Sequence, residues 1–440
     1  MLEVLANRIY RHLFFAQVIA LVGTGLATVA LGLLAYDLAG AEAGVVLGTA
    51  LAIKMIAYVG VAPVAAAFAE QLPRRTMLVS LDLVRAGVAL MLPFVTQIWQ
   101  VYVLIFVLQS ASAAFTPTFQ ATIPDVLAEE KDYTRALSLS RLAYDLESVV
   151  SPMIAAALLS VISFHSLFGG TVIGFLASAM LVVSVVLPSP TPSERRGIYD
   201  RTTRGLRIYL ATPRLRGLFA LSLAVSAAGS MVIVNTVVLV QSNFDLDQRA
   251  TALALAAFGA GSMLAALLLP RLLENIPDRQ AMLAGATVLI AGLFIGLAAT
   301  NYLALLPLWL FLGLGYSLAQ TPSGRLLRRS SHSQDRPALF AAQFALSHAC
   351  WLITYPLAGW LGAKAGMPVT FAVLGSIASV AAIAATRLWP ANDPDELEHI
   401  HATLAPNHPH LADAVPVGDG HRHRHSFVID SHHPEWPRLQ

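Results

Sequence analysis

The chain has 440 residues, of which 56% are hydrophobic and only 12% are charged, and its formal net charge is +2. An ordinary soluble domain carries roughly 25% charged residues, so this composition excludes a water-soluble globular protein and indicates a membrane protein. A disulfide-stabilised secreted fold is also excluded, because Cys350 is the only cysteine. The nearly balanced charge gives no indication of nucleic-acid binding.

Twelve apolar runs are each long enough to cross a bilayer, which takes about 20 helical residues. The first six cover residues 13–36, 44–68, 76–95, 101–119, 136–159 and 167–187, and the last six cover 217–240, 250–269, 281–299, 302–318, 339–361 and 368–388. The sequence therefore predicts an all-α membrane protein with twelve transmembrane helices in two six-helix bundles. The predicted domains are the bundles at 1–189 and 216–389, a cytoplasmic linker at 190–215 and a tail at 390–440.

The distribution of basic residues predicts the orientation. With the N-terminus in the cytoplasm, twenty lysines and arginines lie in cytoplasmic segments, whereas the opposite loops hold only Arg249 and Lys364. This bias matches the positive-inside rule and predicts that both termini face the cytoplasm. We expect a monomer in a bacterial inner membrane, with the lipid bilayer as its main partner.

The two halves resemble each other in sequence. The turn Glu70–Arg75 is repeated at Glu274–Arg279, an offset of 204 residues, and Pro152 recurs as Pro356 at the same offset. Two parallel repeats joined by a long loop suit a transporter in which one half rocks against the other around a central site. The repeat therefore favours a secondary transporter over a channel or a membrane enzyme.

On these features the chain resembles the major facilitator superfamily. The turn between the second and third spans of that family reads roughly Gly-x-x-x-Asp-Arg-x-Gly-Arg-Arg, and here residues 66–75 keep an acid and the two final arginines. The resemblance implies a conformational latch at one end of the protein, and the candidates are Glu70, Arg74, Arg75, Glu274 and Arg279. The segment Ser151–Ala156 is similar to a degraded form of the Gly-Pro-x-x-Gly-Gly pattern of proton antiporters, which favours export.

Residues 115–120 and 140–147 resemble the nickel-resistance branch of the superfamily, whose members often carry a histidine-rich cytoplasmic tail. That resemblance implies a divalent metal ion, nickel or else cobalt, zinc or iron, as the substrate or as a ligand of the tail. Protons are the expected coupling ion, and no other cofactor is implied.

Ionisable residues at membrane depth are costly to bury and are functional candidates by default. Arg141 and Asp145 are four residues apart and can pair on one helix face, and Asp82 and Arg85 can pair likewise. Three candidates lack such a local partner, and these are Glu147, Lys54 and His348. A carboxyl group such as that of Glu147 attracts a cation only when ionised, so it could exchange a proton for a metal.

Nine of the thirteen histidines lie after residue 392, mostly as His-x-His pairs. Neutral imidazoles bind borderline divalent metals, so all nine are candidate ligands: His399, His401, His408, His410, His421, His423, His425, His432 and His433. Prolines and the lack of a long apolar run predict a disordered tail in the absence of metal. A polar tail without a metal function is the alternative interpretation.

Three functions remain open from the sequence. The first is export of a divalent transition metal, with nickel preferred and proton antiport as the candidate coupling. The second is export of an organic compound or a metal chelate, with the tail as a metal buffer or sensor. The third is a metal-sensing membrane protein that does not transport. An enzyme is not expected, because the sequence has no nucleotide-binding loop, zinc-protease helix or nucleophile motif.

Overall fold

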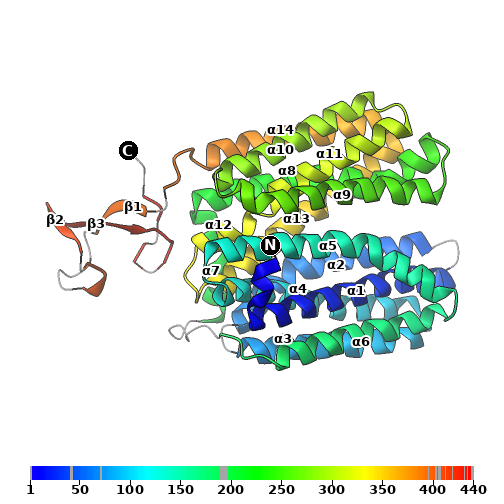
Figure 1. Ribbon diagram of the computed structural model, residues 1–440, viewed down its shortest axis with the longest axis horizontal. Coiled ribbons are helices and arrows are strands. Elements are labelled where there is room, and N and C mark those ends of the chain that lie inside the picture. Colours follow the sequence, from blue (N-terminus) through cyan, green and yellow to red (C-terminus); the bar gives the residue numbers. More distant parts are fainter. Residues whose placement is uncertain are drawn as a thin grey trace.

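The computed structural model describes residues 2–437 except 40–42, 70–71, 189–196, 395, 402–403, 405–407, 412, 419, 431 and 434. The first bundle contains α1 (Arg8–Ala39), α2 (Ala43–Ala69), α3 (Arg74–Met91), α4 (Ile98–Val126), α5 (Glu130–Leu159) and α6 (Phe164–Val183). The second contains α8 (Pro213–Val237), α9 (Gln248–Leu272), α10 (Asp278–Ile295), α11 (Tyr302–Gln320), α12 (Ser323–Arg329), α13 (Arg336–Lys364) and α14 (Met367–Leu388). Figure 1 shows the two bundles as two layers of nearly parallel helices.

Eleven of the described helices are long and apolar enough to cross a membrane, and they include every predicted span except the fifth. That span is α5, whose 30 residues give about 45 Å of helix. Its charged residues lower its hydropathy, but α5 packs between α1 of its own bundle and α9 of the other. Its buried charges are therefore shielded from lipid by other helices, and α5 completes the twelve predicted spans.

The internal repeat is visible in how the helices pair. In the first bundle α1 packs on α6, α2 packs on α4, and α3 packs on both α4 and α6. The second bundle repeats this arrangement with α8 on α14, α9 on α11, and α10 on both α11 and α14. The same pairs recur in the same order, which confirms the predicted fold of two related six-helix bundles.

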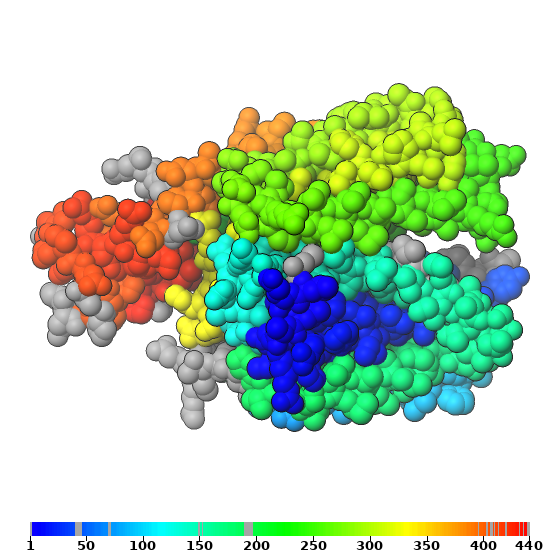
Figure 2. Space-filling view, in the orientation of Figure 1, coloured from blue at the N-terminus to red at the C-terminus, as the bar shows by residue number. Residues whose placement is uncertain are grey.

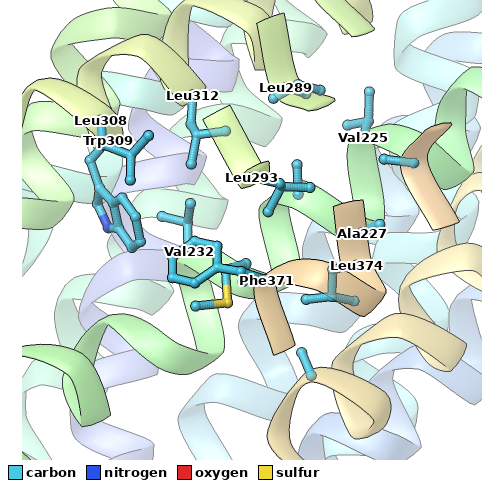
Figure 3. Packing of buried hydrophobic residues seen from close by; sticks show 14 of the residues in the cluster. Val225, Ala227, Val232, Leu289, Leu293, Leu308, Trp309, Leu312, Phe371 and Leu374 are labelled. Atoms are coloured by element: carbon cyan, nitrogen blue, oxygen red, sulfur yellow. The ribbon is translucent and has the colours of Figure 1, made fainter. Parts of the chain in front are cut away.

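Small residues allow close approach of the helices within a bundle. A Cβ atom added at Gly261 of α9 would collide with the backbone of α11 at Leu310, and one added at Gly313 of α11 would collide with the backbone of α9 at Phe258. Such pairs bring backbones into direct contact, which is how helices gain packing energy in lipid. Figure 3 shows the apolar core beside this contact, where Trp309 and Phe371 lie in T-shaped contact.

The two bundles contact each other through two symmetry-related pairs of helices. The fifth helix of each half packs on the second helix of the other, so α5 contacts α9 and α13 contacts α2. In Figure 2 the bundles touch at the end next to the C-terminal segment, and a gap separates them at the opposite end. We call the first end the arginine-rich end, and it is formed by residues 72–75, 125–135, 271–279 and 323–336.

The linker contains an amphipathic helix, α7 (Ile198–Ala211). It packs on α13, and Gly205 allows its backbone to approach that of Ala338. Tyr209 is buried and donates a hydrogen bond to Gln343, whereas Ile198 stays exposed. The linker is therefore docked on the bundle for most of its described length.

The C-terminal segment, residues 392–437, differs from the disordered tail that the sequence predicts. It forms a three-stranded antiparallel sheet in the order β1 (Glu396–His401), β3 (Gly420–Ser426) and β2 (Val415–Val417). The sheet lies beyond the arginine-rich end (Figure 1). Leu397, Phe427 and Ile429 join the apolar cluster at that end of the second bundle. This buried apolar contact, which composition alone does not reveal, gives the segment a fixed fold.

Candidate transport path, closed end and histidine cluster

The buried ion pair of α5 joins the two bundles. Arg141 bonds to both carboxylate oxygens of Asp145, with Nε–Oδ2 and Nη2–Oδ1 distances of 3.2 and 2.5 Å. This confirms the pairing predicted from the spacing. Arg141 Nε also donates to Ser262 Oγ of α9 at 3.0 Å, and its guanidinium lies 4.6 Å from the ring centre of Tyr316 of α11. The pair therefore touches the second bundle as well as its own helix.

The predicted pair Asp82–Arg85 is also formed, within α3. Ser178 donates a hydrogen bond to Asp82 at 2.8 Å, and the Arg85 guanidinium lies over the rings of Phe115 and Phe175. Both charged residues are buried inside the first bundle. All their contacts among the described residues are within that bundle, whereas Arg141 also contacts the second bundle.

The three isolated candidates lie within electrostatic reach of one another. Lys54 is 5.5 Å from the ring centre of Tyr58, and that ring is 4.7 Å from the imidazole of His348. The charge of Lys54 acts on both Glu147 and His348. Glu147 is half-buried, and its side chain lies against Gly25 of α1. Residues of α2, α5 and α13 thus form one polar group, which we call the central polar group (Lys54, Tyr58, Glu147 and His348).

The hydrogen bond of His348 fixes its tautomer. Nδ1 lies 2.7 Å from the carbonyl oxygen of Phe344, and because a carbonyl oxygen can only accept, Nδ1 carries the hydrogen. Nε2 is then left with a lone pair that can accept a hydrogen bond or bind a metal. The partner lies on the same helix, α13. Cys350, two residues further along α13, is buried.

Two ion-pair triads close the arginine-rich end. In the first triad Asp125 of α4 binds both Arg74 of α3 and Arg336 of α13. In the second triad Arg325 of α12 binds Asp278 of α10, with an Nε–Oδ1 distance of 2.8 Å, and also Glu130 of α5. Each triad contains residues from both bundles, so each ties the two halves together.

Further contacts reinforce this closure. Lys131 Nζ and Glu274 Oε1 are 3.0 Å apart and belong to different bundles. Arg325 donates to Thr134 Oγ1 at 2.6 Å, and Arg328 donates to the carbonyl oxygen of Ala128. A cavity of about 640 Å³ remains at this end, with Glu130, Glu274, Asp278 and several arginines in its wall.

The predicted latch residues have different positions. Arg74 and Glu274 take part in contacts that close this end, Arg75 is exposed, and Arg279 donates to the carbonyl oxygens of Thr386 and Trp389 within its own bundle. Glu70 lies outside the described residues, so its pairing stays a prediction. Sequence reasoning missed the other members of the triads, which are Asp125, Glu130, Asp278, Arg325 and Arg336.

The sheet of the C-terminal segment collects histidines on one face. Because successive strand residues point to opposite faces, His399 and His401 of β1 share a face with His421, His423 and His425 of β3. The other face carries the ion pairs Arg422–Glu398 and Arg424–Glu396. The His-x-His spacing was the sequence signal for this arrangement, since it has the period of a strand.

Five of the nine candidate ligands converge, and we call them the histidine cluster: His399, His410, His423, His425 and His433. Their ligand nitrogens all lie within 4.8 Å of one another. His401 is close by, with its Nε2 3.1 Å from His399 Nε2. His408, His421 and His432 lie outside the cluster. Burial, which disfavours the charged form, and the charges of neighbouring histidines together lower the pKa of His399, His401, His410 and His423 to about 4.

Asp393 anchors the C-terminal segment to the bundle. It accepts hydrogen bonds from Arg329 Nη1 at 3.2 Å and from Trp389 Nε1 at 2.9 Å, and it lies 3.7 Å from Arg214. Asp430 forms a second contact, with its Oδ2 3.3 Å from His332 Nε2 in the loop before α13. The sheet is thus held beside the two triads.

Similar proteins are found among transporters. MFS-type transporter YvqJ of Bacillus subtilis (strain 168) is 24% identical over 420 residues, which cover 90% of this chain and 97% of that protein. MFS-type transporter YfiS of the same organism is 25% identical over 158 residues, but the match spans only 38% of that protein and 35% of this chain. Macrolide efflux protein A of Streptococcus pyogenes is 24% identical over 152 residues, 32% of this chain and 37% of that protein.

Solved structures share the fold at low identity. The human organic anion transporter MFSD10 (TETRAN) gives a TM-score of 0.76 at 12% identity, covering 86% of this chain and 99% of that chain. A bacterial homologue of the iron transporter ferroportin, in an outward-facing state, gives 0.73 at 13% identity with the same coverage. The sequence profile of the Major Facilitator Superfamily matches residues 13–246 and 218–415, which include both bundles. The chain is therefore a membrane transporter that belongs to the Major Facilitator Superfamily.

Proposed function

We propose that this transporter exports a divalent transition metal, nickel first among them, from the cytoplasm of a bacterium in exchange for protons. The observation that carries this proposal is the central polar group, in which the imidazole of His348, with a free Nε2, contacts Tyr58 of the other bundle and the charge of Lys54 reaches both His348 and the carboxyl group of Glu147. Imidazole is a good ligand for nickel, cobalt, zinc and copper. A carboxylate adds a negative charge that a proton can neutralise.

The proposed direction rests on the orientation of the chain. The arginine-rich end carries most of the loop arginines, so by the positive-inside rule it faces the cytoplasm. The two triads then close the cytoplasmic side, so the proposed path from the central polar group leads to the opposite side. In this conformation the transporter releases the metal to the outside. The metal enters from the cytoplasm in a second conformation, in which the triads have separated.

Metal and proton compete for the carboxyl group of Glu147, and this competition couples metal export to proton entry. The ionised carboxyl group attracts a cation and the protonated form does not, so metal and proton occupy the site alternately. Arg141 contacts both bundles at a neighbouring level of α5 and stabilises the arrangement of the path around the site.

An exporter of an organic compound is the second candidate, with the C-terminal segment as a metal buffer or sensor. The rings of Tyr58 and Phe344 lie 4.8 Å apart beside His348, and such rings suit an apolar substrate. The similarity to macrolide efflux protein A supports the same interpretation.

Transport into vesicles that hold the purified protein distinguishes the two. With the arginine-rich end outside and an acidic lumen, we expect uptake of Ni²⁺ that collapses when a protonophore is added. A cationic dye serves as the organic probe. Uptake of the dye without uptake of Ni²⁺, Co²⁺ or Fe²⁺ would overturn the metal proposal, and metal uptake that is insensitive to the protonophore would overturn antiport.

A further inference from the structure

The histidine cluster has the nitrogen spacing of a metal site. His399 Nε2 lies 3.0 Å from His433 Nε2 and 3.0 Å from His423 Nε2, and His433 Nε2 lies 3.2 Å from His410 Nε2. Neighbouring ligands held by metal–nitrogen bonds of about 2.0–2.1 Å lie roughly 2.8–3.4 Å from each other in octahedral or tetrahedral geometry. The observed contacts fall in this range, so they fit ligands of a common ion.

Oxygen acceptors fix the tautomer of three of these rings. His399 Nδ1 lies 3.1 Å from the carbonyl oxygen of Leu397, and His425 Nδ1 lies 2.7 Å from that of Ser426. His433 Nδ1 lies 2.9 Å from Asp430 Oδ1. A carbonyl oxygen or an ionised carboxylate can only accept, so each Nδ1 carries a hydrogen.

The consequence is a set of unshared lone pairs that point inward. With Nδ1 protonated, Nε2 of each of these three rings has a lone pair and no hydrogen. His399 Nε2 and His433 Nε2 then face each other at 3.0 Å with no hydrogen to share, and His425 Nε2 is buried without a hydrogen-bond partner among the described residues. Lone pairs at this distance repel unless a cation lies between them. The cluster is therefore built to hold a cation.

We propose that His399, His425 and His433 hold one resident divalent transition-metal ion, with His410 and His423 completing its ligand shell. The site is separate from the transport path, because it lies in the C-terminal segment and not between the bundles. All its ligands are imidazoles, so it selects borderline metals such as nickel, cobalt, copper or zinc over magnesium and calcium. The site goes beyond the proposed transport and does not depend on it.

Asp430 is a positioning residue for this site and connects it to the closed end. Its Oδ1 orients His433 through Nδ1 and accepts two backbone N–H groups, at His432 and His433. Its Oδ2 contacts His332, which stands four residues before Arg336 of the first triad. The ion crosslinks strands β1 and β3 with the segments that carry His410 and His433, and so it fixes Asp430 against this loop.

Metal titration of the purified full-length transporter tests the site. After removal of metal with a chelator, we expect one tight equivalent of Co²⁺, seen by its visible absorption bands. H425A should weaken binding by more than about tenfold, whereas H421A, which removes a histidine of the same sheet face outside the cluster, should leave it unchanged. D430N should keep the spectrum and weaken binding about 10–100-fold, the usual effect of losing an outer partner. Failure of wild-type protein to bind Co²⁺, or equal losses in H421A and H425A, would overturn the proposal.

Two further measurements separate this site from transport and test the link to His332. E147Q should lose proton-coupled uptake and keep the tight Co²⁺ equivalent. Loss of Co²⁺ binding in this variant would count against the separate histidine site, whereas unchanged uptake would count against the transport proposal. Hydrogen exchange of residues 330–336 should slow at least several-fold when metal is added to the wild type, but not when it is added to D430N at saturating metal. Unchanged exchange in the wild type would overturn the link to the closed end.

Discussion

Arg74 and Asp278 stand at the first positions of α3 and α10, 204 residues apart, and carry opposite charges. Each pairs within its own bundle, Arg74 with Asp125 and Asp278 with Arg325. Each of these partners then binds the start of the fifth helix of the other bundle. The closed end is therefore built from two repeat-related triads in which the charges are exchanged.

Truncation of Arg336 is expected to open the arginine-rich end. Its side chain is 16% exposed in the ion pair with Asp125, and breaking a largely buried pair costs roughly 3 kcal/mol or more. Lys131 provides a matched comparison, since it also binds across the bundles but is 60% exposed, where a pair contributes about 0.2–1 kcal/mol. We expect R336A to shift the conformational equilibrium much further than K131A.

The measurement is labelling of a cysteine placed at Leu137, which lies against Gly324 of the other bundle, in a C350A background. A thiol reagent that cannot cross the membrane is added from the arginine-rich end. Labelling should rise at least several-fold in R336A and little in K131A. Equal labelling of both variants would contradict the role of the first triad.

E147Q is expected to abolish proton-coupled transport and leave the protein folded. The amide keeps the size of the side chain but cannot take up a proton, so exchange of proton for metal stops. D37N is the control, since it removes an exposed carboxylate of α1 outside the central polar group. Vesicle uptake under an imposed pH gradient provides the test, and E147Q activity equal to that of D37N would exclude Glu147 as the proton carrier.

H348A is expected to lower metal uptake at least tenfold, because it removes the only imidazole of the central polar group. C350A, two residues along the same helix, should transport like the wild type, since Cys350 is buried and is not a member of that group. Uptake as a function of Ni²⁺ concentration shows whether affinity or turnover falls. If both variants transport normally, the metal does not contact His348.

A larger side chain in place of Gly313 is expected to destabilise the second bundle. G313V places a branched side chain against the backbone of Phe258, and overpacking of this kind costs typically 1–3 kcal/mol. G32A is the control, because nothing lies within 4 Å of a Cβ atom at Gly32. The midpoint of thermal unfolding in detergent should fall for G313V and not for G32A. An unchanged midpoint in G313V would mean that α9 and α11 are not in backbone contact.

Acid is expected to loosen the metal-free C-terminal segment. Burial and neighbouring imidazoles lower the pKa of His401, His410 and His423 from 6.5 to about 4, so these groups bind protons more readily when the segment unfolds. Their contribution is fully present above about pH 6.5 and is lost as the pH falls towards 4. The protection factors of the β1 and β3 amides, which divide out the pH dependence of intrinsic exchange, should fall over this range, and protection factors that stay constant would contradict the burial of these rings.

The sequence was sufficient for the fold because lipid imposes length and hydropathy on each span. The repeat offset also located the pairs of related helices, and the four-residue spacing of Arg141 and Asp145 identified their pairing. The contact of Arg141 with Ser262 was not predictable, because it depends on how α5 packs against α9. The proximity of Lys54 to His348 depends likewise on the contact of α2 with α13.

The fold of the C-terminal segment, unlike that of the bundles, was not predicted from the sequence. Composition predicted disorder, whereas the spacing of the His-x-His pairs already contained the period of a strand. The segment is held in its fold by the burial of Leu397, Phe427 and Ile429 against the bundle. A count of apolar residues within the segment does not detect this contact. The triads were missed for a related reason, since the resemblance directed attention to Glu70 and not to Asp125.

Exchange of charges between the triads has an electrostatic consequence for the opened protein. When the bundles separate, the first keeps Arg74, Asp125 and Glu130, a net charge of −1, and the second keeps Asp278, Arg325 and Arg336, a net charge of +1. The triad residues left on the two bundles therefore carry opposite net charges. Their mutual attraction favours reclosure, and added salt would weaken this attraction.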